Sequence, residues 1–395
     1  MNLSVYGCVS KFRDTDPVMV EAAIRQLSLL FEKEDGTIDA WRRLFGRWKE
    51  GMQVELDVLG ISKLSLGSFE MDWDCAKIAS VLDLLENRRD GGIGRVVDLG
   101  EHIGKRKLLF ADGAPTQVLM DLCSYGKSQD ECSKVVYVYP VSEKHERVFV
   151  TRELYKCVGF DESKVRWIPF ARVLNLDDDD STTAKSPLPS RWIDQAASIL
   201  ENVSGKAFHE YSQDDFYSDE TNAPETFIDT HRIGSTAISI QILQCKRTKE
   251  VKFEWSRIKE SQRDSGLYLQ YAYARICGIQ RKAGSFVSRL PTDLENVDLL
   301  DLLKTSPHAV NIASALANVP GGIKSFGESH DATVLIPHLM TLAKSVSSGH
   351  NALFVKDRNA VDLSVARLQL WRATGEVIRN GLRILNGGVE PVEYM

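Results

Sequence analysis

The chain has 395 residues, of which 43% are hydrophobic, enough to bury the cores of two or three domains. No stretch approaches the run of about 20 apolar residues that a membrane span requires. The first residues lack the features of a secretory signal and of a transit peptide, so we expect a cytoplasmic protein without membrane contact. The seven cysteines include no CxxC pair and predict neither a disulfide framework nor a zinc site.

The net charge of −6 conceals an asymmetry along the chain. Residues 256–395 hold 16 Lys and Arg against 13 Asp and Glu, a net charge of +3, whereas residues 1–255 hold 33 against 42, a net charge of −9. A modest basic excess suits the docking of one folded RNA better than sliding along a polyanion. It favours an RNA partner over DNA, although an ordinary solvated surface explains the charge equally well.

The first 90 residues are predicted to be helical. Apolar side chains recur there at helical spacing, as in Trp41, Phe45 and Trp48. From residue 91 to 180 the pattern changes to short apolar runs bounded by turn residues, such as 135–139 and 165–168. Runs rich in Val and Tyr that alternate with helical stretches predict parallel strands with crossover helices, an α/β arrangement.

The rest of the chain is predicted to be helical. Residues 177–180 are four consecutive aspartates and start a polar segment without periodicity, which predicts a loop. Consecutive carboxylates point in different directions, so we expect no metal site there. Residues 181–255 are expected to form a helical stem, and residues 256–395 an all-helical bundle.

Two segments carry a resemblance. The run Gly-Leu-Tyr-Leu-Gln-Tyr-Ala-Tyr-Ala-Arg at 266–275 resembles the first helix of the arginyl-tRNA synthetase anticodon-binding domain, and Trp-Arg-Ala-Thr-Gly-Glu-Val-Ile-Arg-Asn-Gly-Leu at 371–382 resembles the last. That family also ends in methionine, as this chain does at Met395. The resemblance implies a truncated Rossmann-like class I synthetase catalytic remnant followed by a helical, DALR-like anticodon-binding bundle.

Within that resemblance, aromatic and cationic side chains at helical spacing are candidates for tRNA contact. Tyrosines at such spacing also fit a helix core. The candidates are Tyr268, Tyr271, Arg275 and Lys282 in the first helix, Arg372, Arg379 and Arg383 in the last, and the terminal Met395.

The two signatures with which the family holds ATP, HIGH and KMSK, are not recognisable. Residues 101–105, Glu-His-Ile-Gly-Lys, follow one apolar run and precede another, which predicts strand, turn and strand instead of the strand-to-helix turn that ATP binding needs. The acidic tract at 177–180 stands where the lysine loop is expected, and it would oppose a triphosphate. We therefore expect no arginine activation by the chain.

A possible arginine site lies at residues 112–121, which resemble the family segment whose final aspartate pairs with the substrate guanidinium. The match makes Asp121 the candidate anchor, because a carboxylate binds a guanidinium bidentately. Gln117 departs from the family pattern and is taken with Asp121 as a substrate-binding candidate. Glu143 is an alternative reader of arginine, and a helix-starting aspartate in a solvated turn explains Asp121 without substrate.

Catalytic candidates follow the strand at 134–139. His145 matches a histidine of the family and stands at the carboxyl end of a predicted parallel strand, where open α/β sheets bind ligands. Ser142 either caps the next helix or acts as a nucleophile. A covalent route through Ser142 or Cys157 is left open.

A synthetase-like chain without ATP signatures could use charged tRNA as substrate, since the ester of Arg-tRNA already carries an activated carbonyl. The combination is similar to the fungal arginine-containing cyclodipeptide synthases, which implies a diketopiperazine made from charged tRNA-Arg and a second aminoacyl-tRNA, with no cofactor or metal. Two alternatives stay open: a non-catalytic pseudo-synthetase that binds tRNA-Arg, and residual aminoacylation with a rebuilt ATP site.

Overall fold

The structure is a computed structural model of residues 1–395. It describes residues 34–59, 61, 81–83, 96–98, 104–109, 115–116, 118–123, 133–141, 145–175, 189–212, 229–259, 264–284, 299–355 and 361–395, with the single positions 18, 22, 25, 26, 29 and 32. The chain divides into two compact units. One contains residues 1–54 and 63–172, and the other contains residues 55–62 and 173–395. Each unit is described by itself.

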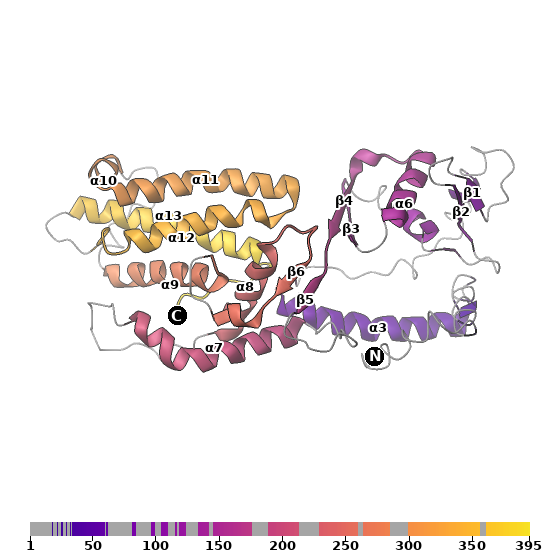
Figure 1. The fold of residues 1–395 in the computed structure, drawn as a ribbon, viewed down its shortest axis with the longest axis horizontal. Helices are drawn as coiled ribbons and strands as arrows, with labels where there is room; N and C mark the ends of the chain where they lie inside the picture. The colour runs from indigo at the N-terminus through magenta and orange to yellow at the C-terminus, as the bar shows by residue number, and fades with distance from the viewer. Residues whose placement is uncertain are drawn as a thin grey trace. The chain divides into compact units, whose positions relative to one another are not determined.

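The first unit contains a parallel strand pair joined by a helix. Strand β3 (Val135–Pro140) pairs in parallel with β4 (Val165–Phe170), and helix α6 (His145–Cys157) with the short 3-10 helix η2 (Glu162–Lys164) forms the crossover (Figure 1). Buried side chains of α6, among them Leu154 and Tyr155, form a core with Val165. The predicted parallel strands with a crossover helix are confirmed in this segment.

A second strand pair in this unit differs from the prediction. Strands β1 (Val96–Asp98) and β2 (Lys105–Lys107) are antiparallel. The sequence predicted parallel strands throughout residues 91–180. The connection between the two strands is too short for a parallel crossover, which needs a dozen or more residues. The two strands predicted on either side of the Glu-His-Ile-Gly-Lys segment are present; the turn predicted between them, residues 99–103, lies outside the described residues.

The second unit begins with a stem. Strand β5 (Val173–Asn175) pairs in parallel with β6 (Val251–Phe253), and helices α7 (Pro189–Ser212) and α8 (Thr230–Leu243) pack beside the 3-10 helix η3 (Trp255–Lys259). The ring of Trp192 lies 4.4 Å from that of Phe253 and 5.3 Å from that of Trp255, between centroids. Residues 181–255 were expected to form a helical stem, and β6 within them was not predicted. A three-residue strand such as β6 is too short to show a period in the sequence.

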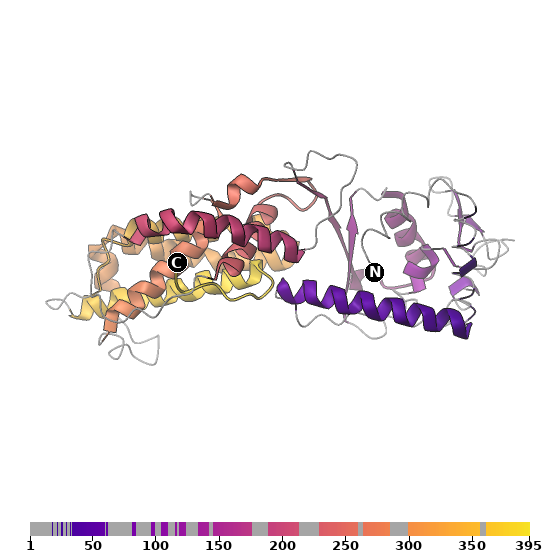
Figure 2. The same cartoon turned by 90° about the horizontal axis from the view of Figure 1, so that it is seen from below.

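The C-terminal bundle follows the stem. It contains α9 (Gly266–Ala283), α10 (Leu300–Thr305), α11 (Pro307–Ser329), the 3-10 helix η6 (Ala332–Val334), α12 (Ile336–Gly349) and α13 (Val361–Leu385). In Figure 1, α11, α12 and α13 run alongside one another, and Figure 2 shows the same bundle from below. Among the described residues after 255 there is no strand, so the expected helical bundle is confirmed.

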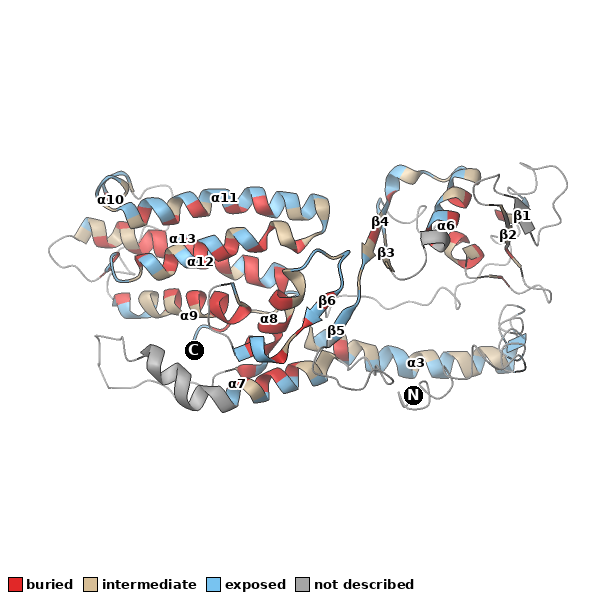
Figure 3. Ribbon diagram, viewed as in Figure 1, coloured by how far each residue is buried: buried red, intermediate tan, exposed pale blue. Residues whose placement is uncertain are grey.

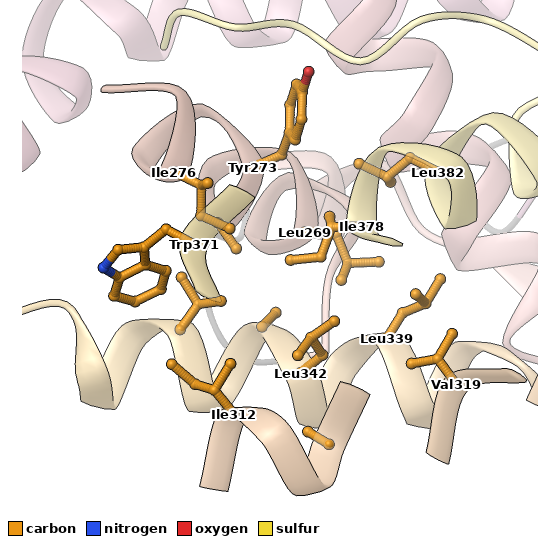
Figure 4. Packing of buried hydrophobic residues seen from close by; sticks show 14 of the residues in the cluster. Leu269, Tyr273, Ile276, Ile312, Val319, Leu339, Leu342, Trp371, Ile378 and Leu382 are labelled. Carbon is orange, nitrogen blue, oxygen red and sulfur yellow. The ribbon is translucent and has the colours of Figure 1, made fainter. Parts of the chain in front are cut away.

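One apolar core holds the bundle together. Each of four helices contributes buried side chains to it, such as Leu269 from α9, Ile312 from α11, Leu339 from α12 and Trp371 from α13 (Figure 4). The Trp371 indole is fully buried, and its Nε1 donates to the carbonyl of Leu353 at 3.2 Å. Burial of a large aromatic side chain with its polar atom satisfied stabilises the core strongly. The bundle is therefore a rigid support for whatever its surface binds.

No helix in the described part of the chain is long and apolar enough to cross a membrane. The described residues also contain no group of three or more His, Cys, Asp or Glu side chains that could hold a metal ion.

Candidate tRNA interface

Helix α9 is set in place by its first residues. The Ser265 side chain accepts from the backbone N–H of Tyr268 at 3.0 Å and caps the helix. Gly266 lies against α8 so closely that a Cβ there would stand 2.7 Å from the Cα of Ala237 and 2.7 Å from the carbonyl oxygen of Thr236. The start of α9 therefore has room only for glycine, and this contact fixes how α9 crosses α8.

Tyr268 belongs to the core and not to the surface. Its side chain is 9% exposed, and its hydroxyl donates to Ser347 Oγ at 2.9 Å on helix α12. A ring held inside the bundle has no open face on which a base could stack. The structure thus supports the alternative that the sequence left open for this tyrosine, and Tyr268 leaves the set of candidate contacts.

Tyr271 and Arg275 form a half-buried pair one turn apart on α9. The guanidinium carbon of Arg275 lies 4.6 Å from the centroid of the Tyr271 ring, and its Nη2 donates to the Tyr271 hydroxyl. Lys282, further along α9, is exposed. A stacked arginine and tyrosine with a nearby cation are groups that bind unstacked bases and phosphates.

The three candidate arginines on α13, Arg372, Arg379 and Arg383, form an arginine stripe that divides into two parts. Arg372 is exposed, and no carboxylate among the described residues pairs with it. Arg379 Nε and Arg383 Nε lie 2.9 and 3.0 Å from the two carboxylate oxygens of Glu390. The hydrogen bond to Glu390 also raises the pKa of Arg379. Two of the three predicted phosphate-binding arginines are therefore engaged by a carboxylate of the same chain.

Glu390 reaches these arginines because the chain reverses after α13. Gly387 has a φ of 63°, and a Cβ there would stand 2.2 Å from the carbonyl oxygen of Leu59, so only glycine fits. The glycines at 387 and 388 were the available sequence signal for this reversal, since glycine commonly ends a helix. The position of Glu390 beside the last turns of α13 was not predicted.

A buried polar network then fixes the tail to the bundle. Asn386 Oδ1 accepts from Ser235 Oγ at 3.0 Å and from Ser239 Oγ at 2.9 Å. The backbone N–H of Val392 donates to Gln270 Oε1 at 3.1 Å. Because buried polar groups are costly unless hydrogen-bonded, these matched partners hold the tail in one position.

The last residues place an arginine and a tyrosine at the surface. Arg281 lies with its guanidinium carbon 3.8 Å from the centroid of the Tyr394 ring, and it donates to the carbonyl of Glu393 at 3.1 Å. Met395 is half-buried against the apolar cluster of the stem. Of these residues only Met395 was a candidate from the sequence.

Beneath the tail lies a pair of buried titratable groups, Tyr273 and Cys277. Burial raises the pKa of both side chains. The hydrogen bond between them raises the pKa of Tyr273 further and lowers that of Cys277, although burial outweighs this effect at the thiol. Both groups are therefore neutral at physiological pH, and neither is a nucleophile or a base.

The candidates in the first unit are only partly described. Asp121 is half-buried, and its Oδ2 accepts from the Tyr137 hydroxyl at 3.4 Å. Gln117, Ser142 and Glu143 lie outside the described residues, and His145 is described only as the first residue of α6. The proposed roles of these residues stay predictions.

Comparison with known proteins adds the family context. Residues 269–395 match the DALR anticodon binding domain. A protein of Schizosaccharomyces pombe named a probable cytoplasmic arginine–tRNA ligase is 26% identical over 387 residues, covering 97% of this chain and 56% of the relative. One of the same name in Dictyostelium discoideum is 34% identical over 197 residues, covering 50% and 31%. The chain spans about half, or less, of the length of these relatives.

Solved structures show the same fold. The arginyl-tRNA synthetase of Plasmodium falciparum superposes with a TM-score of 0.71 at 16% identity, over 99% of this chain and 63% of the synthetase chain. The chain is thus arginyl-tRNA synthetase-like and ends in a DALR anticodon-binding domain. The predicted fold class, a class I α/β region followed by a helical anticodon-binding bundle, is confirmed.

The comparisons also contradict the function expected from the sequence. The relatives are named arginine–tRNA ligases, so the predicted cyclodipeptide synthesis is wrong, and the second aminoacyl-tRNA that it required has no support. That prediction depended on signatures that were missing from the sequence. A missing motif does not specify the chemistry that replaces it.

Proposed function

We propose that the chain serves arginyl-tRNA aminoacylation and that its bundle, residues 264–395, binds tRNA-Arg. The observation that carries this proposal is the match of residues 269–395 to the DALR anticodon binding domain, in a chain whose relatives are named arginine–tRNA ligases.

The bundle surface supports the proposal chemically. The paired Tyr271 and Arg275 offer a stacking platform, and Lys282 and Arg372 offer exposed cations for phosphates. The buried network around Asn386 holds the tail, and with it Glu390, against the same helices. A preorganised surface of this kind loses little conformational freedom on binding.

The ATP-dependent step of the reaction is proposed from the names of the relatives alone. The sequence contains neither a His-Ile-Gly-His nor a Lys-Met-Ser-Lys tetrapeptide, and the chain covers only about half the length of its relatives. Saccharomyces cerevisiae has both a cytoplasmic and a mitochondrial relative among the matches, so a cytoplasmic location stays a prediction.

The test is a binding titration followed by a charging assay with the purified chain. We expect saturable binding of tRNA-Arg, tighter by about tenfold than the binding of a tRNA for another amino acid at 0.1 M salt, a preference within the range of sequence-specific RNA contacts. Equal binding of both tRNAs would contradict the proposal. With arginine and ATP added, formation of Arg-tRNA would assign the complete reaction to this chain, and its absence would limit the chain to the tRNA-binding step.

A further inference from the structure

Helix α3 (Asp35–Val58) exposes an aromatic and cationic surface that the anticodon-binding bundle does not explain. Leu44 and Trp48 are 47% and 48% exposed, and Arg43 and Arg47 are also exposed. Residues spaced by four lie on one side of a helix, so these four form one surface, which we call the Trp48 patch. Figure 3 shows α3 as exposed or intermediate along nearly all of its length.

Trp48 ends a ladder of aromatic rings on α3. The ring centroids of Trp41 and Phe45 lie 6.2 Å apart, and those of Phe45 and Trp48 lie 5.4 Å apart, with interplanar angles of 19° and 28°. Trp41 and Phe45 are half-buried, whereas Trp48 is largely exposed. An indole held in orientation by its neighbour is a platform on which a nucleic-acid base can stack.

The residues around Trp48 are also positively charged, which favours contact with phosphates. Residues 42–49 contain four Lys and Arg and no Asp or Glu, in a chain whose net charge is −6. Arg42 pairs with Asp39 at 3.3 Å, whereas Arg43 and Arg47 have no carboxylate partner among the described residues. No residue of α3 is buried before Glu55, so these cations are not needed to complete a core.

We propose that the Trp48 patch is a second tRNA contact, outside the anticodon-binding bundle, in which Arg43 and Arg47 bind backbone phosphates and Trp48 stacks on an unpaired base. The proposal rests on the function proposed above for the identity of the RNA. Protein surfaces that bind RNA combine cations, which contact phosphates, with exposed aromatic rings, on which bases stack. A lipid-binding helix would instead expose its whole apolar face, and here Trp41 and Phe45 are half-buried.

The experiment measures tRNA-Arg affinity of the full chain across a salt series. Charge reversal at Arg43→Glu with Arg47→Glu is expected to weaken binding about tenfold at 0.1 M salt and to flatten the dependence of log affinity on log salt by about 1.5 units, as two lost phosphate contacts require. Trp48→Ala is expected to weaken tRNA binding about fivefold or more without changing the slope of the salt dependence. Trp48→Phe, which keeps an aromatic ring, is expected to restore the affinity.

Arg42→Glu is the matched control. It makes one of the two charge reversals on the same helix, but on the opposite side from the patch, where Arg42 pairs with Asp39. We expect it to change affinity less than twofold. All four residues in these variants are surface positions, and thermal unfolding of each variant verifies that the fold is retained.

The outcomes separate this inference from the function on which it rests. If the wild-type chain prefers tRNA-Arg and the patch variants bind it equally well, or if Arg42→Glu weakens binding as much as the double reversal does, the inference is overturned while the proposed function stands. If the wild-type chain shows no preference for tRNA-Arg, the proposed function fails and the inference fails with it. Binding to phosphatidylserine vesicles that Trp48→Ala abolishes, with tRNA affinity unchanged, would assign the patch to a lipid surface and overturn the inference.

Discussion

Glu390 decides how much of the arginine stripe on α13 is available to RNA. Its carboxylate contacts both Arg379 and Arg383, and all three side chains are about two-fifths exposed. Exposed ion pairs of this kind contribute little to stability, about 0–1 kcal/mol each. The carboxylate therefore acts mainly on the local charge: together with Glu376, 3.8 Å from Arg379 Nη1, it offsets the two positive charges where a phosphate would bind.

Glu390→Gln is expected to strengthen tRNA-Arg binding severalfold at low salt and to steepen its salt dependence, because it removes one of the two carboxylates that pair with these arginines. The unfolding midpoint should hardly change. Asp301→Asn removes one exposed carboxylate elsewhere in the bundle and serves as the control. Weaker binding by Glu390→Gln would mean that the carboxylate positions the two arginines for RNA instead of opposing it.

Cys277 and Tyr273 make the stability of the bundle depend on alkaline pH. Burial raises the pKa of both groups in the folded chain, so the unfolded chain loses protons first as the pH rises. The stabilisation is fully present below the unfolded thiol pKa of about 8.5 and is lost as the pH rises above it. The free energy of unfolding should therefore fall between pH 7.5 and 9.5, and it should fall less in Cys277→Ala.

A thiol-labelling assay checks the same residue independently. Cys245 is exposed and Cys277 is buried, so a thiol reagent at pH 8 should modify Cys245 first and leave Cys277 unmodified in the folded chain. Equal labelling rates at the two cysteines would show that the tail does not cover Cys277 in solution.

At the scale of the elements, the crossing of α8 and α9 depends on Gly266. Gly266→Ala should destabilise the chain by about 1–3 kcal/mol, because the new methyl group would meet the backbone of α8. Gly278→Ala is the matched control: in the same helix its Cβ would meet only Arg281 Nη2 at 3.8 Å, so the higher helix propensity of alanine should make it neutral or slightly stabilising. The measurement is the free energy of unfolding of both variants in urea. Equal values for the two variants would show that α8 and α9 do not cross as described.

The elements also show what the sequence could predict. Helical spacing predicted α9 and α13, and both helices bury side chains along much of their length. The short strands β2, β5 and β6 offered too few residues to reveal a period, and the partner of β5, like that of β6, lies far away in the sequence. The same holds for the candidate surface: helical spacing was enough to bring Tyr271 and Arg275 together, one turn apart, whereas the position of Glu390 depends on a chain reversal.

At the scale of the whole molecule, the α/β region followed by a helical bundle was predictable from the order of patterns along the chain. Function was not, because the resemblance gave the kind of ligand while the chemistry was inferred from absent motifs. Tyr268 illustrates the same limit within the bundle, since its spacing fitted both the surface and the core, and only the contact with Ser347 separates the two.

The central claim is that the bundle reads the anticodon of tRNA-Arg, and one measurement tests it directly. The affinity of the purified chain is compared for tRNA-Arg and for the same tRNA with its anticodon replaced, at fixed salt. We expect the replacement to weaken binding about tenfold or more, since each lost base stack or base contact costs about 1–3 kcal/mol. Equal affinity for the two RNAs would contradict anticodon recognition by this chain.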